Sequence, residues 1–306
     1  MVSQQIIQTS ENILAKHGSS MAGKTILITG VAADSIAGEL AVQLSAVNPS
    51  LLILSARSEA RVKPIIAKIK SKNRDTAMRF LQMDLSSRED IQRAVNTMDD
   101  IPVVDHLACV AGVMWPPFSR TVDGIESQFA VNYLANFQLT RLLMPKLKAS
   151  GPGSSIIIVA SSAVRSGKVD FEDFNFLNTE RYTPSIGYSQ SNAARVMFVK
   201  KLAQRLAGTQ IRAYSVDPGA VQSGLQRHFT PETRAWIDSF RASGEMWTSA
   251  SEGAATIITG MLDPTIAGSN GAFLHHNAVA DEELHSHLID QDNWDKLWTL
   301  SEKLLA

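Results

Sequence analysis

Residues 25–39 read TILITGVAADSIAGE, and the order of residue types in this stretch sets the expected architecture. The first five residues are apolar or β-branched, which is typical of a strand buried on both faces of a parallel sheet. Gly30 follows at once, and a helical pattern begins near Gly38. Such a turn presents backbone N–H groups to an anion, and glycines let the backbone come close. Asp34 disfavours an anion, so an ordinary strand-to-helix connection is an equal alternative for the turn alone.

Short apolar runs alternate with helical patterns along most of the chain. Further runs of strand length are Leu51–Ser55, Arg79–Met83, His106–Ala111, Ile156–Ala160 and Ile211–Val216. The helical patterns between them include Gly38–Val47, Arg88–Asn96, Ile125–Leu147 and Ser189–Leu206. This alternation implies parallel strands joined by right-handed crossovers. We therefore predict an α/β fold with a single-domain, doubly wound parallel sheet of the Rossmann type.

The 306 residues are long enough for two domains, but the unbroken alternation favours one. We expect a helical arm over residues 1–22, with Ile6, Ile7, Ile13 and Leu14 on its apolar side, and one domain over residues 23–306. The longest irregular region, about residues 220–247, is expected to form a substrate loop or lid.

Composition excludes several classes of function. Lys+Arg is 29 and Asp+Glu is 30, so the net charge of -1 offers no general attraction to nucleic acid or anionic membrane. No apolar run approaches the roughly 20 residues that span a bilayer. The single cysteine, Cys109, cannot form an internal disulfide and is expected to be a buried small residue. A reducing, cytoplasmic setting is the natural expectation.

Arg57 follows the second predicted strand, where dinucleotide-binding sheets select between two cofactors. An acidic residue there holds a free ribose 2′-hydroxyl, whereas an arginine accommodates a 2′-phosphate. Arg61 and Lys63 follow and would add charge. The alternative is a solvated arginine at a strand end; together with the turn, Arg57 favours NADP(H) over NAD(H).

Several ordered motifs give the chain a family resemblance. Tyr188-Ser189-Gln190-Ser191 opens a predicted helix, and Ser161-Ser162 follows the fifth strand. Asp84-Leu85, Ala111-Gly112 and Asp217-Pro218-Gly219 follow three other strands. From about residue 23 to the end, the chain resembles the short-chain dehydrogenase/reductase family, and most closely its retinol dehydrogenase-like group.

The resemblance implies an NADP(H)-dependent oxidoreductase and assigns roles to its residues. The catalytic set would be Asn132, Ser162 and Tyr188, together with Asn192, and Tyr188 follows Ser162 by 26 residues. The cofactor would be held by Gly30, Ser35, Ile36, Arg57, Asp84, Leu85, Ala111, Gly112, Tyr188, Asn192, Pro218, Gly219, Val221 and Ser223.

Asn192 is the main departure from the family, which carries its catalytic lysine at this position. A nearby cation lowers the pKa of a tyrosine by about 1–3 units, and a neutral amide does not. Reduction uses the protonated phenol, whereas oxidation needs the phenolate. We therefore expect a slow reductase with a poorer reverse reaction, and a gain in activity from Asn192→Lys. Arg195 is a possible replacement cation, but solvent exposure or a carboxylate partner is favoured for it.

The substrate side is rich in aromatic residues. They lie after three strands and are Trp115, Phe118, Phe171, Phe174, Phe176, Phe229, Trp236, Phe240 and Trp247, with Met114 and Met246 beside them. Loops at the carboxyl ends of strands form ligand sites in such sheets. We expect a bulky hydrophobic carbonyl compound, such as a polyketide, terpenoid, steroid-like or retinoid-like molecule of secondary metabolism.

Other interpretations stay open at this point. A non-redox isomerase, cyclase or dehydratase on the same scaffold is one, and a catalytically silent cofactor- or partner-binding protein is another. His275-His276 and His285-Ser286-His287 lack metal-ligand spacing, so no metal site is expected. By analogy with the family, a homo-oligomer is possible.

Overall fold

The computed structural model describes residues 8–242 and 248–306, and its centre is one mixed sheet. The strand order is β3-β2-β1-β4-β5-β6-β7-β8, and all neighbours are parallel except β7 and β8. The strands are β1 Thr25–Thr29, β2 Leu51–Ala56, β3 Met78–Gln82, β4 His106–Cys109, β5 Ser155–Val159, β6 Arg212–Asp217, β7 Phe273–His275 and β8 Ala278–Val279. The predicted doubly wound parallel sheet is confirmed.

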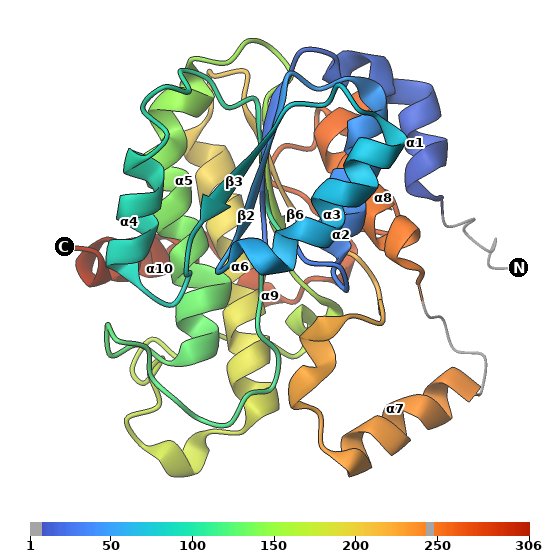
Figure 1. Ribbon diagram of the computed structural model, residues 1–306. Helices are drawn as coiled ribbons and strands as arrows, with labels where there is room; N and C mark the ends of the chain where they lie inside the picture. Colours follow the sequence, from blue (N-terminus) through green and yellow to red (C-terminus); the bar gives the residue numbers. More distant parts are fainter. Residues whose placement is uncertain (1–7, 243–247) are drawn as a thin grey trace, which may run out of the picture.

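Helices cover both faces of the sheet (Figure 1). One apolar layer joins the sheet to α4 Arg88–Asn96, α5 Ala135–Lys148, α6 Pro184–Arg205, α9 Ser286–Ile289 and α10 Gln291–Leu304. The opposite layer joins it to α1 Ser10–His17, α2 Ile36–Leu44, α3 Glu59–Lys72 and α8 Ala250–Leu262. The central strands are buried on both sides, which explains why their sequences do not alternate.

The predicted strands agree with the structure to within two residues, whereas β7 and β8 were not predicted. These two strands are three and two residues long, too short for a periodic pattern. The helix expected over 125–147 begins instead with a π-helix at Phe129–Leu134 and continues as α5. α6 begins before the expected Ser189, because Thr183 caps it and Pro184 suits its first turn.

The N-terminal helix α1 packs onto α2 and α8 rather than extending from the fold. Ile13 and Leu14 are buried there, as expected, while Ile6 and Ile7 lie outside the described residues. Ser10 Oγ donates to the carbonyl of Ser251 in α8 at 2.6 Å. Ile13 and Leu14 are therefore part of the apolar layer that also contains α2, α3 and α8.

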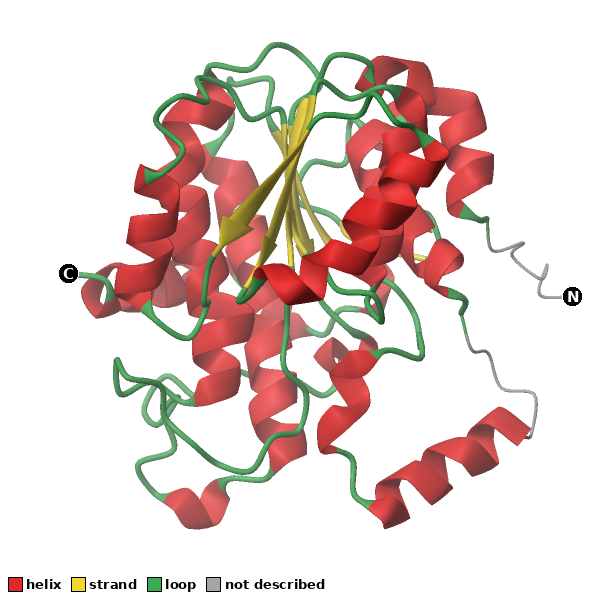
Figure 2. Cartoon of the chain, viewed as in Figure 1, coloured by secondary structure: helices red, strands yellow, loops and turns green. Residues whose placement is uncertain are grey.

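Two features locate the functional edge of the molecule. The strand arrowheads point toward the end where α7, Pro231–Ala242, lies apart from the sheet, as Figures 1 and 2 show. Ligands bind at the carboxyl ends of strands in sheets of this type. Among the described residues, no helix has both the length and the apolar character that a bilayer span requires.

Candidate active site

A cavity of about 990 Å³ opens at the carboxyl edge of the sheet. Its walls come from the loops after β1 to β6 and from the start of α6. It brings together nearly all the predicted site residues: Gly30, Ser35, Ile36, Arg57, Asp84, Leu85, Ala111, Gly112, Ser162, Tyr188, Pro218, Gly219, Val221 and Ser223. Asn132 and Asn192 do not line the cavity but are fully buried in the protein.

The turn after β1 is shaped by one glycine and one helix cap. Gly30 has a φ of 80°, and a Cβ there would lie 2.8 Å from the Ala111 Cα, so only glycine fits. Ser35 is the N-cap of α2, and its hydroxyl accepts from the backbone N–H of Gly38 at 3.0 Å. Ile36 and Ala37, which begin the same helix, line the cavity. The helix N-terminus therefore faces the space that an anion would occupy.

Asp34 turns toward the loop after β6 instead of into the turn. Its backbone carbonyl accepts from the N–H of Gly224 at 2.9 Å, and a Cβ on Gly224 would lie 2.2 Å from the Asp34 carboxylate. This loop contains the 3-10 helix η6, Gly224–His228. Asp34 thus joins the two sides of the cavity mouth.

Beyond the end of β2, Arg57 and Arg61 are exposed and line the cavity, whereas Lys63 does not line it. Asp84 also lines the cavity, and its carboxylate accepts from the N–H and the hydroxyl of Ser86 at 2.9 and 2.7 Å. The end of β2 is therefore the positively charged end of the cavity.

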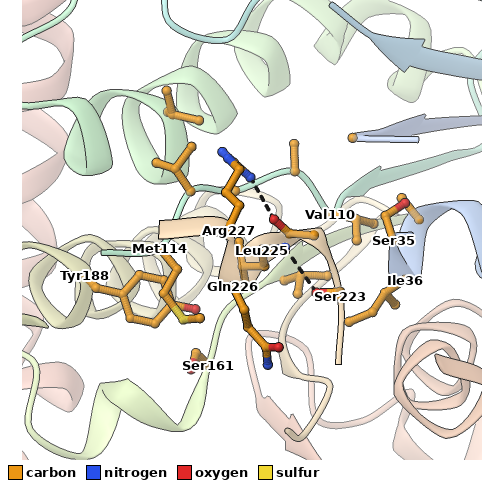
Figure 3. A pocket seen from close by; sticks show the side chains of 18 of the residues that line it. Ser35, Ile36, Val110, Met114, Ser161, Tyr188, Ser223, Leu225, Gln226 and Arg227 are labelled. Atoms are coloured by element: carbon orange, nitrogen blue, oxygen red, sulfur yellow. Dashed lines mark hydrogen bonds between the residues drawn. The ribbon is translucent and has the colours of Figure 1, made fainter. Parts of the chain in front are cut away.

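Tyr188 lies in the cavity wall beside Ser161, one residue before the serine expected from the sequence (Figure 3). Burial raises the pKa of Tyr188, and the Ser161 side chain lowers that pKa by a smaller amount. Ser162 also borders the cavity, but it is exposed and begins the 3-10 helix η4, Ser162–Arg165. Counting residues back from Tyr188 cannot choose between adjacent serines, because the choice depends on where β5 ends.

Asn132 sits inside the π-helix and holds the loop after β4. Its Oδ1 accepts from the N–H of Val113 at 2.8 Å, and its Nδ2 donates to the Val113 carbonyl at 2.9 Å. The same Nδ2 donates to Ser191 Oγ in α6 at 2.9 Å. A π-turn interrupts the regular helix ladder and is often found at functional sites. Asn132 therefore fixes the β4 loop against α6.

Arg195 reaches the site from α6, and the expectation of solvent exposure or a carboxylate partner is wrong. Its side chain is 3% exposed, and it forms no ion pair with any described residue. Its guanidinium donates to the backbone carbonyls of Asn132 and Ala111, the latter at 2.8 Å, and to Asn192 Oδ1 at 3.2 Å. Residues 188, 192 and 195 share one face of α6, because side chains three or four positions apart are neighbours on a helix.

The charge of Arg195 acts on Tyr188 across this face. Burial lowers the pKa of Arg195 to about 10, so the guanidinium remains charged at neutral pH. Its charge lowers the pKa of Tyr188, as does Asn192, against the larger effect of burial. Asn192 also donates from Nδ2 to the Tyr188 carbonyl at 2.9 Å.

Asp217, at the end of β6, is a buried carboxylate in the cavity wall that the sequence did not single out as catalytic. Oδ1 accepts from the N–H of Gly219 at 3.0 Å, while Oδ2 has no hydrogen bond and lies 3.7 Å from His275 Nε2. Burial raises the pKa of Asp217. Its negative charge raises the pKa of Tyr188 and so opposes the effect of Arg195.

Among the described residues, part of the expected aromatic set lines the cavity. Trp115 and Phe229 line the cavity with ring centroids 5.1 Å apart, and Met114 lies beside them. Phe118, Phe171, Phe174 and Phe176 pack against other protein side chains instead. The side chains of Trp236 and Phe240 and the residues Met246 and Trp247 lie outside the described residues.

Trp115 is unusual in two ways. Its φ of 54° lies in the left-handed region, which is rare for a bulky residue. Its indole Nε1 is buried without a hydrogen-bond partner, although it belongs to a residue of the cavity wall. Strained backbone and unpaired donors concentrate at functional sites.

The other chemistry-bearing residues have structural roles. No group of three or more His, Cys, Asp or Glu among the described residues has metal-site geometry. His275 Nδ1 contacts Glu283, and His285 Nε2 contacts the Gly167 carbonyl. Cys109 is fully buried on β4, and burial raises the pKa of Cys109 to about 12.

Sequence comparison places this geometry among known proteins. A family model for short chain dehydrogenases matches residues 24–175. Retinol dehydrogenase 14 of Mus musculus is 31% identical over 297 residues, covering 94% of this chain and 87% of the relative. Polyprenol dehydrogenase of Homo sapiens is 31% identical over 259 residues, covering 80% of this chain and 76% of the relative.

Solved structures share the fold. An uncharacterised protein from Mycobacterium paratuberculosis superposes with a TM-score of 0.72 at 25% identity, covering 97% of each chain. A short chain dehydrogenase from Burkholderia cenocepacia, determined in complex with NADP, superposes with a TM-score of 0.65 at 21% identity, covering 84% of this chain and 99% of that one. With the sheet, the cavity and these relatives in agreement, the chain belongs to the short-chain dehydrogenase family and is an oxidoreductase.

Proposed function

We propose that the protein is an NADP(H)-dependent reductase that converts a carbonyl group of a bulky hydrophobic molecule to an alcohol, with Tyr188 as proton donor. The observation that carries this proposal is the single cavity that runs from the Arg57 end of the sheet to Tyr188. It joins a place for the cofactor phosphates to a place for the reacting carbonyl.

The residues of the cavity fit a nicotinamide dinucleotide. Gly30 and Gly219 let the backbone pack closely against Ala111 and Thr248, where a Cβ would collide, and both glycines line the cavity. The N-terminus of α2 suits the pyrophosphate, and Arg57 suits a 2′-phosphate. When bound, such a cofactor supplies the hydride that a carbonyl carbon accepts. Pro218 and Val221 would border its nicotinamide end.

The state of Tyr188 supports reduction as the working direction. Burial raises the pKa of its phenol above the usual value, which is about 10 in model peptides. At neutral pH the phenol is therefore protonated and can give its proton to the substrate oxygen. Alcohol oxidation would instead need the phenolate, which is scarce under these conditions.

The remaining site residues position the reactants. Ser161, rather than Ser162, would donate a hydrogen bond to the carbonyl oxygen, because Ser161 lies by Tyr188 in the pocket (Figure 3) whereas Ser162 is exposed. Asn132 acts through the Val113 loop and is a positioning residue. Arg195 supplies the positive charge on the α6 face, while Asn192 accepts from it. The lysine that the sequence lacks at position 192 is thus replaced by a cation one helical turn further on.

The substrate class follows from the other end of the cavity. Met114, Trp115 and Phe229 form an apolar wall at this end of the cavity. Pockets of this kind select a largely apolar ligand and orient it with a few polar groups. The names of the curated relatives, retinol dehydrogenase and polyprenol dehydrogenase, denote long apolar alcohols.

The test is NADPH consumption with a panel of apolar aldehydes and ketones, including a retinoid aldehyde, and matched product analysis. Tyr188→Phe should bind NADPH normally but lose about 10²–10⁴-fold in kcat, the usual contribution of a positioned acid. Ser161→Ala should lose kcat, whereas the adjacent Ser162→Ala should not. Turnover without NADPH consumption, or full activity of Tyr188→Phe, would refute the proposal.

A further inference from the structure

Three arginines from separate elements converge at one end of the cavity. Arg57 follows β2, Arg61 lies in the first turn of α3, and Arg227 lies in η6 on the loop after β6. All three line the same cavity, and all three side chains are exposed to solvent. Figure 3 shows the Arg227 side chain extending from η6, with Leu225 and Gln226 next to it and with Ser35 and Ile36 in another part of the same pocket.

These like charges are close enough to affect each other. Partial burial lowers the pKa of Arg227, and the positive charges of Arg57 and Arg61 lower it further. Cations placed together without an anion repel one another, and such an arrangement is favourable only when a negative ligand joins it.

The described residues supply little counter-charge. The side chains of Arg57 and Arg61 form no hydrogen bond or ion pair with any described residue. Arg227 Nη1 donates to the Gly224 carbonyl at 3.1 Å, within its own loop. Asp34 is the carboxylate whose charge acts on Arg227. Of the charges that act on Arg227, two are positive and one, from Asp34, is negative.

The position of Arg227 is fixed relative to the phosphate turn. The Gly224 N–H donates to the Asp34 carbonyl at 2.9 Å, so the start of η6 is tied to the turn that precedes α2. A side chain at position 224 would collide with the Asp34 carboxylate, which explains the glycine. Leu225 and Phe229, on either side of Arg227, line the cavity as well.

We propose that Arg227 is a third arm of a phosphate site with Arg57 and Arg61, and that this site binds the 2′-phosphate of the cofactor. A phosphomonoester carries nearly two negative charges and several acceptor oxygens, which matches a cluster of arginines. Arg227 and Phe229 are on the same loop. Binding of the phosphate by Arg227 would therefore also position Phe229 in the wall of the substrate pocket. This inference rests on the proposed function and adds to it a residue from the substrate side.

Calorimetric titration of the full chain with NADPH and NADH tests the site. Arg227→Gln should weaken NADPH binding by about ten-fold or more, which corresponds to about 1.4 kcal/mol, and leave NADH binding unchanged. The matched control is Arg74→Gln, because Arg74 is exposed and does not line the cavity. It makes the same change in net charge and should alter neither affinity. Arg227→Lys keeps the charge and should lose less NADPH affinity than Arg227→Gln.

Competition with 2′-AMP and 5′-AMP separates the phosphate groups. Arg227→Gln should weaken 2′-AMP and spare 5′-AMP, while inorganic phosphate should compete with 2′-AMP only weakly. Amide hydrogen exchange in residues 223–229 should slow with NADPH more than with NADH, and this difference should disappear in Arg227→Gln.

The outcomes distinguish this inference from the function beneath it. If the wild-type protein prefers NADPH but Arg227→Gln keeps that preference, the third arm is refuted and the reductase proposal stands. Equal weakening of NADPH and NADH would move Arg227 to the pyrophosphate and also refute it. If the wild-type protein binds neither cofactor, both proposals fail.

Discussion

Arg195 carries a buried positive charge. Among the described residues, all of its hydrogen-bond partners are neutral. Taking a charge out of water is costly unless other groups compensate, and here backbone carbonyls and Asn192 do so. The contact with Asn192 also changes the expectation for a lysine at position 192. That substitution would place an ammonium beside the guanidinium in the protein interior, so a loss of stability replaces the expected gain in activity.

Removal of the Arg195 charge should change the pH dependence of the reaction. The charge lowers the pKa of Tyr188, so Arg195→Met should raise that pKa. Alcohol oxidation needs the phenolate, and its rate should therefore rise with pH at a higher midpoint than in the wild type. One pKa unit corresponds to about a ten-fold loss of oxidation at neutral pH, with a smaller loss of reduction.

The measurement is a pH profile of kcat in both directions. Arg195→Lys keeps a cation and should retain a profile closer to the wild type. Equal losses in both directions at every pH would show that Arg195 only supports the local structure.

Spacing and residue type predicted most of the residues that line the cavity, but not the contacts that depend on three-dimensional packing. The motif around Tyr188 located the cavity, because residues after parallel strands meet at one edge of the sheet. The burial of Arg195 was not predicted, because helical spacing shows which face of α6 carries the residue but not which segments pack against that face. Arg227 lies in a 3-10 helix of five residues, which is too short for a periodic pattern, and no spacing in the sequence relates it to Arg57.

At the level of elements, the turn between β1 and α2 shows how a serine shapes the region. The Ser35 hydroxyl accepts a hydrogen bond from the N–H of Gly38 and also hydrogen-bonds to the backbone of Ala32. It therefore stabilises both the turn and the start of the helix. Residue type predicted the strands well, because buried parallel strands are nearly continuous apolar runs. The π-helix around Asn132 was not predictable, because its extra residue per turn leaves no periodic signature over six residues.

The cap provides a matched pair of variants. Ser35→Ala should lower the free energy of unfolding by about 1 kcal/mol, the usual contribution of an N-cap serine. Ser58 is the N-cap residue of α3, but its side chain makes no capping hydrogen bond, so Ser58→Ala should have a much smaller effect. Urea denaturation of both variants measures the difference. Equal effects would show that the Ser35 hydroxyl does not stabilise α2.

On the scale of the whole molecule, two separate apolar layers hold the helices onto the sheet. The α1 arm belongs to one of them, where it covers α2 and α8. Residues far apart in sequence are joined there, since Ser10 and Ser251 form two hydrogen bonds. The amphipathic pattern predicted that this arm would pack, but not against which helices.

A core truncation tests how much the arm contributes. Ile13 is 1% exposed, so Ile13→Ala should lower the free energy of unfolding by about 2–4 kcal/mol, the cost of removing buried methylene groups. Ile289 is 50% exposed, and Ile289→Ala should cost well under half as much. Thermal and urea unfolding of the two variants give the comparison. A negligible effect at Ile13 would mean that the arm detaches without cost to the rest of the fold.

The burial of Cys109 has a practical consequence for spectroscopy. A thiol with its pKa raised to about 12 holds almost no thiolate at neutral pH, and thiolate is the form that maleimides and iodoacetamides attack. The folded protein should therefore not react with such labels at neutral pH. A cysteine introduced at the exposed position of His228 in η6 would take up a single fluorophore without any background mutation. Its emission would report directly, in real time, on the loop that we propose contacts the cofactor phosphate.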